Sequence, residues 1–172
     1  MANIVAATIR LLETKSPKDV TLRDVALESG HGPRLIIEWF GGKGGLYSAV
    51  FEKIFKDLTE SGELFYADVA IRNETKIAFQ VFNYMQINHP DVVESMRKDF
   101  LVARAVKERL QTVRGLSEKQ ADLTARRLAV LSLGVGLFRE FVDLSDDEVV
   151  KMMQDEFKAT TGFTFPDNPD RS

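Results

Sequence analysis

Three basic side chains near the N-terminus have types and positions suited to binding DNA. Arg34 carries a planar, forked guanidinium that can donate two parallel hydrogen bonds to the edge of a guanine. Lys43 follows Gly41 and Gly42 at the expected start of a helix, where an ammonium group and free backbone amides together suit a phosphate. Arg23 either reaches a phosphate or a base, or remains a solvated charge. These residues predict binding chemistry rather than catalysis.

The elements that would position these cations are predicted over residues 21–50. Thr21 and Asp24 have the spacing of a capping box at the start of a helix, and Gly30 suits the left-handed residue that ends it. Pro33 suits the first position of the next helix. Two short helices joined by a turn with glycine indicate a helix-turn-helix, whose second helix enters the major groove of DNA.

Eight residues are the predicted DNA contacts of this segment. Thr21 serves mainly as a cap, with a phosphate contact as a secondary role. Trp39 either packs between helices, which we favour, or donates its indole N–H to a phosphate. The full set is Thr21, Arg23, Pro33, Arg34, Leu35, Ile37, Trp39 and Lys43.

Composition narrows the functional classes. The 172 residues include no cysteine, which excludes disulfides, thiolate metal sites and cysteine nucleophiles, and two histidines make a histidine-rich metal site unexpected. No apolar run is long enough for a membrane span, and the amphipathic N-terminus predicts a folded helix rather than a signal peptide. We therefore expect a cytoplasmic protein without cofactor or metal. Residues 1–58 carry eight basic and seven acidic side chains, whereas the whole chain has a net charge of −3.

The remaining pattern predicts an all-α protein of about nine helices. The first covers residues 3–14, the fourth runs from 43 to about 58, and later ones cover 73–88, 91–113 with a break left open, 118–142 and 146–161. We expect a helix-turn-helix domain at 1–50 and a body at 51–172, with the fourth helix bridging the two.

Residues 4–55 resemble the DNA-binding head of the tetracycline-repressor (TetR) family of bacterial regulators. The resemblance covers about a third of the chain and constrains residue types across four helices. It rests on Ile4, Ala6, Ala7, Leu11, the run from Val20 to Ala26, Ser29, Gly30, Phe40, Lys43 and Leu46. It implies a ligand-responsive repressor, in which a homodimer binds a palindromic DNA operator and the body binds a small molecule.

The body offers candidates for both implied roles. A small, largely apolar ligand would contact Phe79, Phe82, Met85, Phe100 and Phe138, each of which could equally be ordinary core. Small residues allow helices to approach closely, so a dimer interface is predicted at Leu131, Gly134, Gly136 and Met152. The competing interpretation is that the glycines allow helices to pack closely within one subunit.

Two residues of the second helix depart from the family pattern. Ile37 is aliphatic where the family usually has an aromatic residue that touches phosphate, and Glu38 adds a negative charge. The alternative hypothesis is therefore a TetR-fold regulator that acts through protein–protein contacts with weak or lost DNA binding. An enzyme is not predicted, because no arrangement of nucleophile, base and acid is visible.

Overall fold

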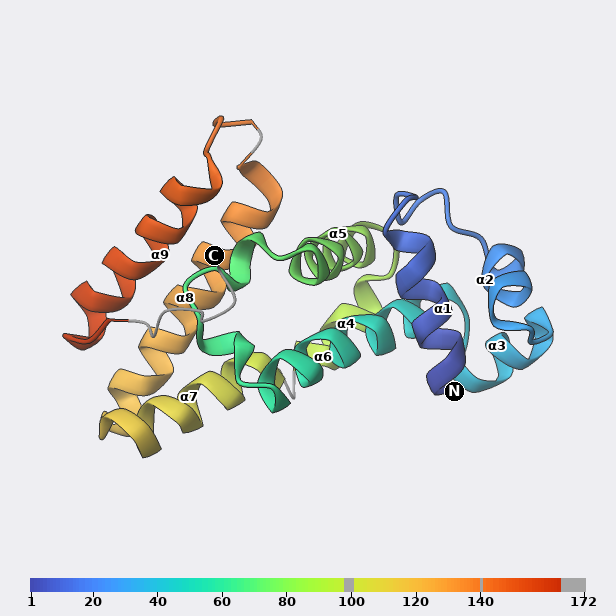
Figure 1. Cartoon of the computed structure of the whole chain (residues 1–172). Helices are drawn as coiled ribbons and strands as arrows, with labels where there is room; N and C mark the ends of the chain where they lie inside the picture. Colours follow the sequence, from blue (N-terminus) through green and yellow to red (C-terminus); the bar gives the residue numbers. More distant parts are fainter. Residues whose placement is uncertain (98–100, 140, 165–172) are drawn as a thin grey trace. The chain divides into compact units, whose positions relative to one another are not determined.

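The computed structural model describes residues 1–97, 101–139 and 141–164, which form helices and no strands. The all-α prediction is therefore confirmed for these ranges (Figure 1). No helix in them combines the length and apolar character that crossing a membrane requires. The elements, including the short 3-10 helices η1 and η2, are α1 (Ala2–Leu12), α2 (Leu22–Ser29), α3 (Pro33–Phe40), α4 (Lys43–Glu60), η1 (Glu63–Phe65), η2 (Val69–Ile71), α5 (Asn73–Asn88), α6 (Pro90–Arg97), α7 (Leu101–Arg114), α8 (Glu118–Phe138) and α9 (Asp146–Thr161).

Helix ends follow the capping signals of the sequence. Thr21, Ser117 and Ser145 each accept a hydrogen bond from the backbone N–H three residues on, and the side chain at that position bonds back to the cap. Gly30 and Gly162 end α2 and α9 in the left-handed conformation. These residues satisfy backbone groups that a helix end leaves without partners, which is why the boundaries were predictable.

The chain forms two compact units. The first comprises residues 1–54 with the described part of 77–99, and the second comprises residues 55–76 with the described part of 100–172. Helices α4 and α5 each pass from one unit to the other. Most of α5 and all of α6 group with the helix-turn-helix in this division, whereas the predicted domains at 1–50 and 51–172 divide the chain once.

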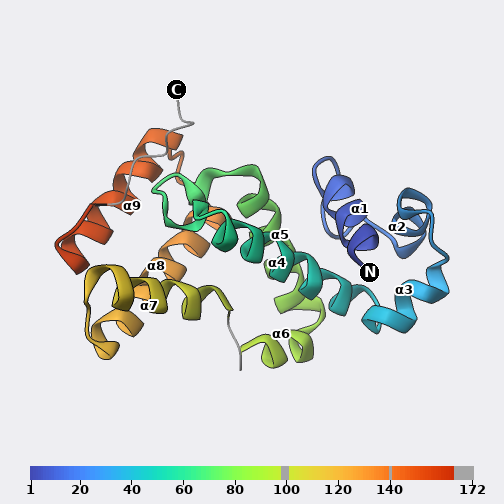
Figure 2. The ribbon, with the colours of Figure 1, turned by 60° about the horizontal axis from the view of Figure 1, so that its bottom comes forward.

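The first unit is built around apolar residues from four helices. Ile4 of α1, Val25 of α2, Ile36 of α3 and Leu46 of α4 are at most 1% exposed. Helix α2 packs on both α1 and α3. Figures 1 and 2 both show α1, α2 and α3 side by side at the N-terminal end of the chain. These four side chains form the centre of the core of the first unit.

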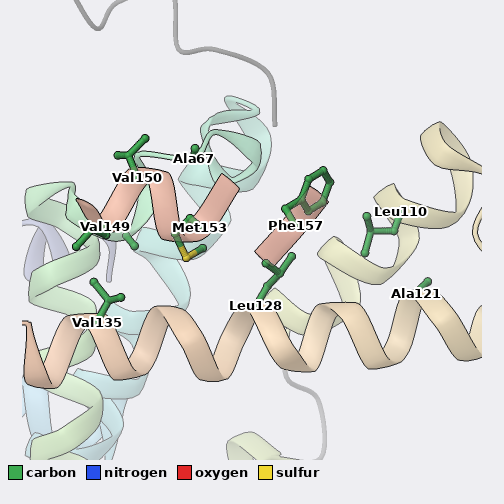
Figure 3. Packing of buried hydrophobic residues seen from close by; sticks show 10 residues of the cluster. Ala67, Leu110, Ala121, Leu128, Val135, Val149, Val150, Met153 and Phe157 are labelled. Carbon is green, nitrogen blue, oxygen red and sulfur yellow. The ribbon is translucent and has the colours of Figure 1, made fainter. Parts of the chain in front are cut away.

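The core of the second unit lies between α8 and its neighbours. Helix α8 packs against α7 and α9, with η2 completing the layer. Figure 3 shows Leu128 and Val135 of α8 facing Val149, Met153 and Phe157 of α9. All five side chains are buried, so this apolar seam holds the helices of the unit together.

Helix α8 ends earlier than predicted. The expected helix ran to residue 142, but α8 ends at Phe138. The Arg139 guanidinium donates to the carbonyl oxygen of Leu144 at 3.2 Å and pairs with Asp146 at 2.6 Å. Asp143 takes a φ of 54°, a left-handed conformation that turns the chain back. These contacts of Arg139 hold the turn between α8 and α9, where the apolar pattern favoured a longer helix.

Candidate nucleic-acid interface

Helix α3 presents a mixed face to solvent. Ile36 is fully buried, and at about 100° per residue Arg34 and Glu38 lie on the opposite side of the helix. Both side chains are exposed. Ile37 lies between the two faces and is 53% exposed. The helix therefore offers a guanidinium, a carboxylate and an aliphatic side chain to any partner.

The guanidinium groups of Arg23 and Arg34 form no ion pair with another described residue. Both side chains are exposed. Neighbouring cations of the same unit are engaged: Arg10 pairs with Glu28 at 2.8 Å and Lys15 with Asp24 at 3.3 Å. Arg23 at the start of α2 and Arg34 on α3 are therefore among the cations of this unit that are available to an external anion.

Thr21 is held as a helix cap, as predicted. Its hydroxyl oxygen accepts from the backbone N–H of Asp24 at 3.2 Å, and its own N–H and O–H both donate to the Asp24 carboxylate at 2.8 Å. These bonds from Thr21, with the backbone N–H as the largest contributor, hold the pKa of Asp24 below its usual value of 3.8. The Asp24 carboxylate is therefore held at the helix cap.

Lys43 opens α4, as expected, and its side chain is half-buried. Its Nζ lies 3.4 Å from the carbonyl oxygen of Lys18, to which it donates. The same atom lies 4.7 Å from the centroid of the Tyr84 ring and 5.4 Å from that of Tyr47. The predicted phosphate contact is therefore an ammonium already held against aromatic faces.

Glycines allow close approach at the start of α4. A Cβ at Gly44 would lie 2.8 Å from Cγ of His89, and one at Gly45 would lie 1.9 Å from the carbonyl oxygen of Phe40. The His89 ring also lies 5.9 Å from that of Tyr84. Tyr84 and His89 were not predicted at this site, because they are some forty residues from Lys43 in the chain and no local spacing connects them to it.

Trp39 and Leu27 expose apolar surface on the head. Trp39 is 38% exposed and its ring centroid lies 6.1 Å from that of His31, whose Nδ1 donates to the carbonyl oxygen of Ser29 at 2.8 Å. Leu27 of α2 is 87% exposed and was not among the predicted contacts. Whether Trp39 also donates to a phosphate stays a prediction.

The predicted ligand contacts fall in both units. Phe79 and Met85 are buried, Phe82 is half-buried and its ring lies 5.4 Å from that of Phe51. Phe138 is 60% exposed. Phe100 lies outside the described residues. The role of these residues in ligand binding stays a prediction.

The predicted dimer contacts lie on the α8 and α9 surface. Leu131 and Met152 line a shallow groove of about 490 Å³, together with acidic and basic residues of α9. On α8, Leu123, Val130 and Leu137 recur every seven residues and are all at least 37% exposed. This seven-residue spacing is visible in the sequence but was not part of the predicted interface. A Cβ at Gly134 would meet no atom within 4 Å.

The described architecture is that of an all-helical protein that begins with a helix-turn-helix. No protein-family model and no curated protein matches the chain. Solved structures do match. The TetR family repressor AlkX from Dietzia sp. strain DQ12-45-1b, implicated in biodegradation of n-alkanes, is 15% identical, with 93% of this chain and 94% of that chain covered and a TM-score of 0.62. A TetR transcriptional regulator from Rhodococcus sp. RHA1 is 16% identical, with 92% and 93% covered and a TM-score of 0.64. The chain therefore has the fold of TetR-family transcriptional regulators.

Proposed function

We propose that this protein is a DNA-binding transcriptional regulator that binds a palindromic operator as a homodimer. The observation that carries the proposal is the exposed guanidinium of Arg34 on the second helix of a helix-turn-helix, which forms no ion pair with any residue that the structure describes. A recognition helix reads base edges from its N-terminal residues, and Arg34 is the second residue of α3. The likeness in fold to two transcriptional regulators supports the proposal.

The roles of the contacts follow from their chemistry. Arg34 pairs with a guanine edge, and Ile37 meets the methyl group of thymine. Arg23 and Lys43 neutralise phosphates on either side of the groove. Pro33, Leu35 and Trp39 shape the surface around them, and the exposed Thr21 adds a secondary phosphate contact.

A homodimer would use the apolar surface of α8 and α9. Leu123, Val130 and Leu137 give α8 a stripe of exposed apolar residues, which is suited to packing against the same helix of a second copy. Leu131, Gly134, Gly136 and Met152 lie on the same two helices. Two-fold symmetry is also what a palindromic operator requires.

Regulation would come from a small, largely apolar ligand in the body. Its candidate contacts on α5 are the buried Phe79 and Met85 and the half-buried Phe82, which belong to one unit. Its binding would change the separation of the two heads and thereby the fit to the operator, with repression as the default mode. We expect this regulator to act in the bacterial cytoplasm, without a cofactor and without catalysis.

The test is selection of DNA from a random pool by the purified protein, followed by fluorescence anisotropy at low and moderate salt. Variants Arg34→Ala and Lys43→Ala are compared with Lys119→Ala, which removes an exposed lysine outside the helix-turn-helix. We expect the selection to enrich a palindromic DNA sequence. Arg34→Ala and Lys43→Ala should bind it more weakly than the wild type, and Lys119→Ala should bind it equally well. Lys43→Ala should also reduce the slope of the logarithm of the binding constant against the logarithm of the salt concentration. The expected reduction is about 0.9 for each phosphate contact that is lost.

The opposite result would support the protein-contact hypothesis. If no site is enriched and the weak binding is equally reduced in all three variants, DNA reading is rejected. The exposed apolar side chains Leu27 and Ile37 would then mark a protein-binding head.

A further inference from the structure

The ammonium group of Lys43 is held by an aromatic ring that lies outside the helix-turn-helix. Tyr47 belongs to the same helix and lies one turn further on, but the nearer ring is that of Tyr84 on α5, with its centroid 4.7 Å from Nζ. A cation over the face of an aromatic ring is attracted by the negative potential of that face. Tyr84 thus fixes a side chain whose length would otherwise leave it free to rotate.

Tyr84 is itself held in place. Its ring meets that of Tyr47 edge-on, with 5.5 Å between centroids and an interplanar angle of 76°. Tyr47 is fully buried and donates to the carbonyl oxygen of Pro17 at 2.7 Å. Tyr84 also lies beside His89, whose ring is close to Gly44 of α4. The rings of Tyr47, Tyr84 and His89 therefore form one aromatic cluster at the start of α4.

This aromatic cluster leaves the Lys43 ammonium group able to bind an anion. An ammonium has three N–H donors, and the structure gives Lys43 a long hydrogen bond to Lys18 in addition to the ring faces. The Lys43 side chain is half-buried, so part of it still meets solvent at the N-terminus of α4. A flexible lysine loses rotamer freedom on binding, and an ammonium that is already held loses less.

We infer that Tyr84 is a positioning residue for the phosphate contact of Lys43. The inference rests on the proposed function, since it concerns how that site binds DNA. Tyr84 touches no DNA in this scheme. It acts through Lys43, and it makes DNA affinity depend on a residue of α5.

The test is a double-mutant cycle on the selected DNA with Tyr84→Leu, Lys43→Ala and the combined variant. Tyr84→Leu removes the ring face and should weaken binding about two- to fivefold. In the Lys43→Ala background the same change should have no effect. Tyr84→Phe keeps the ring and should bind like the wild type.

Three results would overturn the inference. These are unchanged binding by Tyr84→Leu, tighter binding, which would mean that the ring competes with phosphate, and an equal loss in both backgrounds, which would mean a general structural effect. Failure of the proposed function is distinct, because then the wild type itself would bind no selected site.

A measurement without a destabilising change covers the case in which Tyr84→Leu does not fold. The wild-type protein is labelled with 13C at lysine Cε, and the Lys43 signal is assigned with Lys43→Arg. Ring currents should displace this signal from those of the other lysines, and the displacement should persist in the complex with DNA. A signal that moves to the position of an unshielded lysine on DNA binding would refute the inference.

Discussion

The carbonyl oxygen of Phe40 lies where a side chain at Gly45 would begin, since an ideal Cβ there would be only 1.9 Å from it. Phe40 is the last residue of α3 and Gly45 is in the first turn of α4. The two helices can therefore approach this closely only with glycine at position 45. This close approach fixes the orientation of the recognition helix α3 relative to α4.

Gly45→Ala should destabilise the protein. The obstructing atom belongs to the backbone and cannot rotate away, so α3 or α4 must shift, which we expect to lower the free energy of unfolding by about 1–3 kcal/mol. Urea unfolding at fixed protein concentration measures the change. Gly32→Ser is the control, because a Cβ there meets no atom within 4 Å and the hydroxyl can cap α3. Equal stability of the two variants would contradict the close approach.

Tyr47→Phe should destabilise the protein through a lost hydrogen bond. The phenol donates to the buried carbonyl oxygen of Pro17, which the substitution leaves without this donor, at a cost of about 1–3 kcal/mol. Tyr84→Phe is the matched control, because the Tyr84 hydroxyl makes no hydrogen bond with another residue in the described part of the chain. Burial also raises the pKa of Tyr47, so its phenol should ionise last in an absorbance titration. If both variants unfold at the same urea concentration, the bond contributes nothing.

Acid should weaken the cap of α2. The pKa of Asp24 is lowered in the folded state, so its carboxylate stabilises the fold at pH values above the unfolded pKa of about 3.8. That contribution is lost as the pH falls from there through the folded pKa. Asp24→Asn should therefore lose less stability than the wild type over this window, as followed by urea unfolding at several pH values. Parallel curves for the two proteins would show that Asp24 is not coupled to folding.

Gly134→Ala should weaken the dimer without harming the helix. Within one chain the added methyl group meets no atom, and alanine favours a helix over glycine by about 1 kcal/mol. Where two α8 helices pack closely, the same methyl would separate them and raise the dimer dissociation constant in sedimentation equilibrium. Lys119→Ala, on the exposed start of α8, should leave that constant unchanged. A dimer that is as tight as the wild type would place Gly134 away from the interface.

The helices of this protein were largely determined by local sequence. Thr21, Ser117 and Ser145 begin helices, and Gly30 and Gly162 end them, through hydrogen bonds and backbone conformations that involve only nearby residues. The predicted bounds of α5, 73–88, and of α9, 146–161, are those observed. The positions of Arg34 and Lys43 at the start of α3 and α4 followed from the same signals.

Tertiary structure decided what no local pattern could show. Tyr84 and His89 meet Lys43 and Gly44 because α5 returns to the start of α4, and helical periodicity carries no information about which distant ring will lie beneath an ammonium group. The end of α8 is a different case, because Arg139 bonds across the turn to Leu144 and Asp146, which are near it in the chain, although the apolar run favoured a longer helix. Local hydrogen bonds determine where helices begin and end, whereas the contacts between helices depend on the packing of the whole unit.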